Sequence, residues 1–202
     1  MSEEPDGATP LDPDEREGLR FKHVQTRGEL DRLEQANIVD GLRWLNRQKT
    51  LDVLSDAFVY RLHKELFGQV WRWAGQRRQT EKNIGVAPHQ VDVQLRNLLD
   101  NTRHQIDHKA YPPVELALRF HHRLVQIHVF PNGNGRHARI MTDALLRHCL
   151  HHPPIRWAGP TDDRDLQAAA AHRSAYIRAL READARNTAP LLKLFGGEPS
   201  RE

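Results

Sequence analysis

The sequence predicts a mainly α-helical domain with one small β-hairpin, and three observations carry that prediction. Apolar residues recur at helical spacing in six to eight segments of the chain. One segment, residues 76–87, breaks this rhythm with alternating polar residues beside glycines, which favours a turn-rich stretch or a short hairpin. No apolar run approaches the roughly 20 residues needed to span a bilayer, so we expect no membrane contact.

The first two helices are expected before this hairpin. Residues 26–48 place leucines near helical spacing, although Gly41 could interrupt the helix. Ser55 is suited to cap the next helix, and Gly68 is suited to end it.

Later helices are predicted from the same periodicity and from capping residues. Pro112 and Pro113 suit the first turn of the helix predicted at 112–128. Proline lacks a backbone N–H, and the N–H groups of a first helical turn have no partner within the helix. The predicted segments are residues 93–107, 112–128, 135–150 and 161–184, with a short last turn at 189–195.

The chain divides by composition into four parts. Residues 1–18 are polar and acidic, and we expect them to be disordered. We expect residues 19–54 to form an N-terminal helical segment, residues 55–197 the core domain, and residues 198–202 a tail.

Charge and cysteine content narrow the function classes. The 202 residues carry a net charge of +3, with 30 basic residues against 27 acidic ones and no dense basic block, which makes nucleic-acid binding unlikely. Cys149 is the only cysteine, which excludes an internal disulfide and fits a reducing compartment. The acidic N-terminus has no apolar leader, so we expect a cytoplasmic protein.

Residues 127–140, IHVFPNGNGRHARI, combine the side chains of a phosphate site. Gly133 and Gly135 permit positive φ and a close approach of ligand to backbone. The N–H groups of such a turn and the following helix N-terminus attract anions. Arg136 and Arg139, three residues apart, can both point from that first turn, and His128 is placed to act as a general base. An ordinary interhelical turn with surface arginines is the weaker interpretation.

The stretch HVFPNGNGRHAR resembles the motif of the Fic (Fido) family, H-x-F-x-(D/E)-G-N-G-R-x-x-R. The resemblance extends over about residues 26–195, because VWRWAGQRRQTEKNIG is similar to the Fic flap and AYIRALREAD to a later helix beside the adenine pocket. The overall pattern is most similar to the bacterial subfamily called mobile mystery protein B. It implies a Fic-type helical bundle with a hairpin flap.

The resemblance also implies an activity, protein adenylylation with ATP and Mg²⁺. His128 would take the proton from a Ser, Thr or Tyr hydroxyl of a target protein, and Phe130 would anchor the loop. The nucleotide would be held at the motif and at the adenine pocket, by Gly133, Asn134, Gly135, Arg136, Arg139, Tyr176 and Asp184.

The flap is expected to serve the target as well as the nucleotide. Lys82, Asn83, Ile84 and Gly85 would form the flap strand, and the target protein would dock on residues 80–87 by adding a strand. A regulatory partner protein is a further expectation.

Asn132 departs from the family pattern, which usually has an acidic Mg²⁺ ligand there. Mg²⁺ prefers carboxylates, so we expect weak or water-mediated binding. Two alternatives therefore stay open: a Fic-fold phosphotransferase, and a nucleotide-binding, partner-regulated module of a mobile element with weak or no catalysis.

Glu34 is a candidate inhibitory residue. In many Fic proteins a glutamate of the pattern (S/T)-x-x-x-E-(G/N) pairs with the second motif arginine, which here is Arg139. Leu30 and Gln35 depart from that pattern. The other interpretation of Glu34 is a solvated charge on a helix surface.

Overall fold

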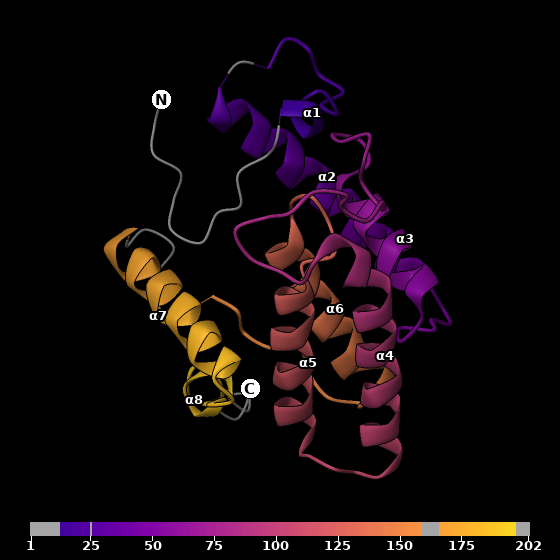
Figure 1. Cartoon of the computed structure of the whole chain (residues 1–202), viewed down its shortest axis with the longest axis vertical. Coiled ribbons are helices and arrows are strands. Elements are labelled where there is room, and N and C mark those ends of the chain that lie inside the picture. The colour runs from indigo at the N-terminus through magenta and orange to yellow at the C-terminus, as the bar shows by residue number, and fades with distance from the viewer. Residues whose placement is uncertain (1–12, 25, 159–165, 197–202) are drawn as a thin grey trace.

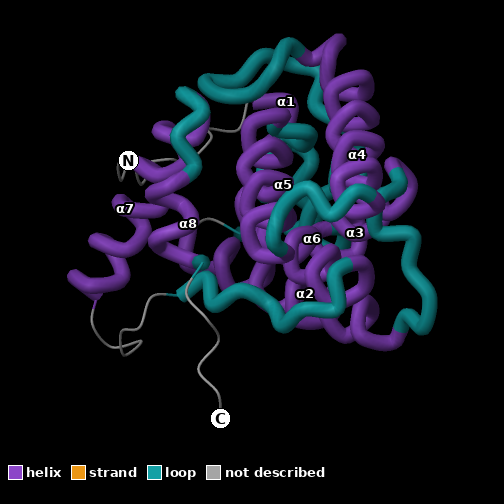
Figure 2. The backbone as a smooth tube through the Cα atoms, turned by 90° about the horizontal axis from the view of Figure 1, so that it is seen from below, coloured by secondary structure: helices purple, strands orange, loops and turns teal. Residues whose placement is uncertain are grey.

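The computed structural model describes residues 13–24, 26–158 and 166–196. Within them the chain is built from helices joined by loops (Figure 2). The bounds are α1 (Pro13–Arg16), α2 (Arg27–Arg47), α3 (Asp56–Phe67), the 3₁₀ turn η1 (Pro88–Gln90), α4 (Val91–Asp107), α5 (Pro113–Ile127), α6 (Asn134–Cys149), α7 (Leu166–Asp184) and α8 (Ala189–Phe195). None of these helices is long and apolar enough to cross a membrane.

Antiparallel α4 and α5 stand beside α6, with α2 and α3 packed on one side and α7 and α8 on the other (Figure 1). Helix α1 falls within the segment expected to be disordered, whose first twelve residues lie outside the described part. The caps expected at the start of the 161–184 helix also lie outside it.

Two apolar clusters hold the bundle. The larger contains buried side chains of α2 to α6, such as Leu45, Leu62 and Leu145. The smaller lies where α5, α7 and α8 meet, around Leu118 and Leu191. Helix α2 therefore shares its core with the later helices.

Helix α2 runs unbroken through Gly41, so the glycine does not interrupt it. A Cβ at Gly41 would lie 2.8 Å from Leu66 Cδ2 and 2.9 Å from the Glu65 carbonyl oxygen. The glycine therefore serves close packing of α2 on α3. The predicted caps of α3 are present, since Ser55 accepts from the Phe58 N–H and Gly68 ends the helix.

The segment expected to form a hairpin, residues 76–87, is an irregular loop with no strand. Within the described residues, the only β-type pairing is an isolated antiparallel bridge between Leu19 and Trp71. The predicted mainly helical fold is confirmed, whereas the predicted β-hairpin is wrong, because a side chain and not a strand ladder holds the flap.

Candidate active site

The glycine-rich turn joins α5 to α6. Helix α5 ends at Ile127, and its C-cap His128 has a left-handed backbone (φ 56°, ψ 63°). Gly133 just before α6 is also left-handed (φ 77°). A Cβ on Gly133 would lie 2.9 Å from the Phe67 ring, so both its φ and its neighbours require glycine.

Asn134 braces this turn with its side chain. Its Oδ1 accepts from the Phe130 N–H at 2.9 Å, and its Nδ2 donates to the Phe130 carbonyl at 2.7 Å. The amide is buried, and both its oxygen and its nitrogen are hydrogen-bonded within the turn. Asn134 can therefore contact a phosphate through its backbone N–H, while its side chain shapes the loop.

His63 of α3, which no sequence pattern had singled out, packs against the turn. Its Nδ1 accepts from the Gly75 N–H at 3.0 Å, so Nε2 carries the hydrogen and donates to the Asn132 carbonyl at 3.1 Å. The ring stacks on that of Phe130, with centroids 3.6 Å apart. Burial holds the pKa of His63 well below its usual value. A single histidine on an amphipathic helix gives no sequence signal for this role.

His128 lies buried at the start of the turn, with 3% of its surface exposed. Burial lowers its pKa to about 3, and the positive charges of Arg78 and Lys82 act in the same direction. The imidazole is therefore neutral at physiological pH, which is the form that can accept a proton.

Arg78, also missed from the sequence, ties the flap to this histidine. Its side chain is 1% exposed and donates to the His128 carbonyl at 2.6 Å and to the Thr80 carbonyl at 2.9 Å. It donates to the carbonyls of Val86 and Ile127 as well. Because one guanidinium binds carbonyls from both arms of the flap, it replaces the strand pairing that a hairpin would need.

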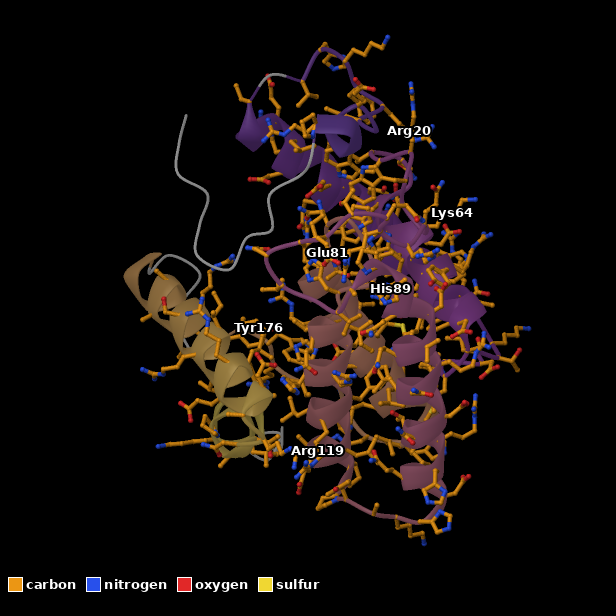
Figure 3. The ribbon with its side chains drawn as sticks, viewed as in Figure 1. Arg20, Lys64, Glu81, His89, Arg119 and Tyr176 are labelled. Atoms are coloured by element: carbon orange, nitrogen blue, oxygen red, sulfur yellow. The ribbon has the colours of Figure 1, made fainter. Side chains whose placement is uncertain are left out.

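The flap lies close against the catalytic candidate. The Arg78 N–H donates to the Val129 carbonyl at 2.9 Å, and the Val86 N–H donates to the Ile127 carbonyl at 3.4 Å. A Cβ on Gly85 would lie 2.7 Å from His128 Cβ. Ile84 is an apolar residue with 45% of its surface exposed near the flap tip. In Figure 3, Glu81 marks the flap above the upper end of α5.

The first motif arginine, Arg136, is ion-paired to Glu34. Arg136 NH1 lies 2.6 Å from Glu34 Oε2, and the other carboxylate oxygen accepts from Trp71 Nε1 at 2.6 Å. Glu34 is 6% exposed. The prediction that Glu34 pairs with Arg139 is therefore wrong, and so is the alternative of a solvated surface charge.

The geometry explains this choice of arginine. Glu34 reaches the site from α2, which packs on α3, and the Arg136 guanidinium lies 4.9 Å over the ring of Phe67 in α3. Arg139 is one turn further along α6 and faces α7, where its charge is felt by Tyr176 and Arg173. Within the described residues Arg139 has no carboxylate partner. Burial lowers its pKa.

Helix α7 supplies the opposite wall. Tyr176 points from α7 toward α5 (Figure 3), and its hydroxyl lies 2.8 Å from Nε2 of buried His121. Burial raises the pKa of Tyr176 to about 12. Asp184 accepts from His122 at 2.8 Å and from Gln126 at 3.0 Å, which ties the end of α7 to α5.

The side-chain oxygens of the turn that could bind a metal ion already accept hydrogen bonds from the backbone. Asn132 Oδ1 accepts from the Gly133 N–H at 2.6 Å, and the Asn134 amide is engaged with Phe130. Within the described residues no three His, Cys, Asp or Glu side chains are grouped to hold a metal. These side chains do not form a resident Mg²⁺ site, so Mg²⁺ could enter only with a nucleotide whose phosphates supply most of its ligands.

The site brings the predicted loop residues, both motif arginines and Tyr176 to one end of the bundle. A buried neutral histidine, a glycine-rich turn and two arginines on the next helix therefore lie together at this end of the bundle. Residues 53–146 match the model of the Fic/DOC family, and the chain contains a Fic domain.

Curated relatives carry the name of an activity. The chain is 28% identical over 134 residues to "Protein adenylyltransferase Fic" of Nematostella vectensis, a match covering 62% of this chain and 31% of the relative. It is 29% identical over 139 residues to "Protein adenylyltransferase fic-1" of Caenorhabditis elegans, covering 65% and 27%. The matches thus span less than a third of these relatives.

Solved structures share the fold. The N-terminal FIC domain of Bep8 from Bartonella sp. 1-1C superposes with a TM-score of 0.64 at 13% identity, covering 85% of this chain and 88% of that one. The BepC protein of Bartonella tribocorum, solved with bound AMPPNP, gives 0.66 at 17% identity, covering 89% and 94%.

Proposed function

We propose that this chain is a protein adenylyltransferase that moves AMP from ATP to a Ser, Thr or Tyr hydroxyl of a target protein. The observation that carries the proposal is a buried neutral His128 directly before a phosphate-binding turn with two arginines. The names of the curated relatives support the same reaction.

The transfer follows from the charges in the site. His128 accepts the hydroxyl proton as the oxygen bonds to the α-phosphorus of ATP. The bond from that phosphorus to the bridging oxygen breaks, and pyrophosphate leaves. Backbone N–H groups of Asn134 and Gly135 at the start of α6 and the two arginines stabilise the negative charge on the phosphates. Such a transfer needs positioning and electrostatics more than covalent help.

ATP enters with Mg²⁺ as its counterion in this proposal, and Asn132 offers an amide oxygen at the edge of the site. The adenine lies beside Tyr176 on α7. The target segment docks on flap residues 80–87, and the exposed apolar side chain of Ile84 supports a contact there.

We also propose that Glu34 restrains the enzyme. Its carboxylate neutralises Arg136 and places negative charge where the phosphates would bind. This contact supports the second candidate, a nucleotide-binding module with weak catalysis controlled by a regulatory partner that moves α2. The single cysteine suits a cytoplasmic location, and the motif pattern suits the mobile mystery protein B subfamily.

Labelled ATP separates the candidates. The purified chain is incubated with Mg²⁺ and ATP labelled at either the α- or the γ-phosphate, and its mass and label are followed. Adenylyl transfer attaches label from the α-position only, as one AMP added to the protein. Label from the γ-position would instead identify a phosphotransferase, and ATP binding with no label would support the module.

A further inference from the structure

A polar groove of about 350 Å³ runs between α4 and α5, outside the nucleotide site. One wall is a row of amide side chains on α4, and the other carries two arginines of α5. Within the described lining there is no Asp or Glu, and the six residues that matter here are Gln94, Asn97, Asn101, Gln105, Arg119 and Arg123.

Arg123 holds an uncompensated charge in this groove. Its guanidinium donates to Gln94 Oε1 at 2.5 Å and to Gln126 Oε1, both of them neutral amides. Within the described residues it has no carboxylate partner. The two amides fix the direction of the half-buried guanidinium and leave its charge available, which favours an anionic ligand.

Arg119 differs, because Glu115 already neutralises it. Its Nε and NH2 donate to Glu115 Oε1 at 3.0 and 2.8 Å, and the guanidinium lies 4.3 Å over the ring of Tyr111. Arg119 therefore forms a rigid wall lower on α5, where Figure 3 labels it, and Arg123 is the anion-binding group.

The amide row suits a peptide in extended form. Gln94, Asn97, Asn101 and Gln105 recur every three or four residues along one face of α4, so they follow the groove. Amide side chains can both donate to and accept from a peptide backbone. A floor of Leu98 and Phe120 gives such a segment an apolar base.

The groove starts where the flap ends. The flap leads through η1 directly into α4, and His89 of η1 lies between them in Figure 3. Arg123 lies four residues, or about 6 Å along the helix axis, before Ile127 at the end of α5, and His128 follows directly. An extended peptide advances about 3.3 Å per residue, so two to four residues cover that distance together with the reach of its side chains.

We propose that this groove binds the target polypeptide beside its modified hydroxyl, and that Arg123 selects an aspartate or glutamate two to four residues from that hydroxyl. The inference rests on the proposed adenylyl transfer for its location, and it adds a substrate preference that the nucleotide site cannot supply.

The test uses dodecapeptides with Ser, Thr or Tyr in the centre, one Asp at each position up to five residues on either side, and Ala or Gln elsewhere. Transfer from α-labelled ATP is measured with the full chain. We expect roughly tenfold preference for Asp two to four residues away on one side, as one charge-assisted hydrogen bond gives. Arg123→Gln should lose this preference, and Arg123→Glu should favour Lys instead.

Arg96→Gln is the matched control, because it removes one positive charge from an α4 arginine that pairs with Asp56 outside the groove. It should keep the preference. Efficient transfer with no dependence on Asp position, or a preference unchanged in Arg123→Gln, would overturn the groove inference and leave the reaction intact.

Peptide binding is measured directly as well, so that the groove is tested even if no peptide is modified. Fluorescence anisotropy compares labelled Asp peptides with otherwise identical Asn peptides on the same variants. Wild type should bind the Asp form several times more tightly, and Arg123→Gln should bind both equally. Equal binding by wild type overturns the groove inference. Failure of the reaction itself shows separately, as absent transfer despite selective binding.

Discussion

At the scale of single residues, His128 combines a strained backbone with a buried side chain. Residues other than glycine rarely adopt positive φ, and such positions gather at functional sites where the surroundings enforce them. Here the Arg78 guanidinium binds the His128 carbonyl and Gly85 of the flap packs against its Cβ.

We expect His128→Ala to lose AMP transfer by about 10²–10⁴-fold while ATP binding stays near wild type, because the base acts on the incoming hydroxyl. Label transfer and calorimetry with ATP measure the two quantities. Wild-type transfer by this variant would show that another group takes the proton.

Glu34→Gln should raise AMP transfer about tenfold. The amide oxygen can still accept from Trp71 Nε1, but the negative charge paired with Arg136 is removed, so the guanidinium can bind the phosphates. Self-modification with α-labelled ATP measures the gain.

The double variant Glu34→Gln with Arg136→Ala is the control, and it should lose the gain because the freed arginine is gone. Glu34→Gln combined with Arg139→Ala tests the second arginine separately. Unchanged activity and ATP affinity in Glu34→Gln would leave the ion pair with a structural role only.

Arg78→Met should destabilise the fold by roughly 3 kcal/mol or more. The apolar side chain fills similar space but leaves several buried carbonyls without donors, each costing about 1–3 kcal/mol. Denaturant unfolding measures the loss. A loss below about 1 kcal/mol would mean that water replaces the guanidinium readily.

At the scale of elements, α2 and the flap both act on the site without belonging to the glycine-rich turn. Helix α2 places Glu34 on Arg136, and the close contact at Gly41 sets how near α2 lies to α3. The flap covers His128 through backbone hydrogen bonds to residues 127 and 129.

We expect Gly41→Ala to push α2 from α3, with a loss of about 1–3 kcal/mol from overpacking and a higher AMP-transfer rate as Glu34 withdraws. Gly28→Ala is the matched control in the same helix, where a Cβ has nothing within 4 Å. That change should be neutral or stabilise by up to about 1 kcal/mol. A stabilising Gly41→Ala would contradict the packing role.

At the scale of the whole molecule, four buried histidines make the fold sensitive to acid. Burial lowers the pKa values of His121, His128 and His137 to about 3, and lowers that of His63 well below the ordinary 6.5. Unfolded chains bind protons at these sites below pH 6.5, whereas the folded chain does not until about pH 3.

The contribution of these histidines to the free energy of unfolding should therefore be fully present above pH 6.5 and decrease as the pH falls toward 3. Each histidine contributes up to about 1.4 kcal/mol per pH unit within that window. Unfolding free energy measured from pH 8 to 4 tests this. His137→Gln, which can still donate to the Val59 carbonyl, should reduce the slope by about a quarter. Constant stability between pH 6.5 and 5 would contradict the buried neutral state.

Local sequence signals predicted most of the helices and the glycine-rich turn. Periodic apolar residues, Ser55 and Gly68 as caps, and the long motif from His128 to Arg139 each act within a few residues, so their spacing alone is informative. They determined the mainly helical fold, the Fic domain and the candidate base.

Only the tertiary structure decided which distant groups meet. Glu34 and Arg136 are 102 residues apart in the chain, and Arg78 and His128 are 50 apart. No local pattern encodes such pairs, because the packing of α2 on α3 and the path of the flap set their distances. For the same reason the sequence misplaced Glu34 on Arg139 and expected strand pairing, while buried carbonyls were satisfied by one arginine side chain.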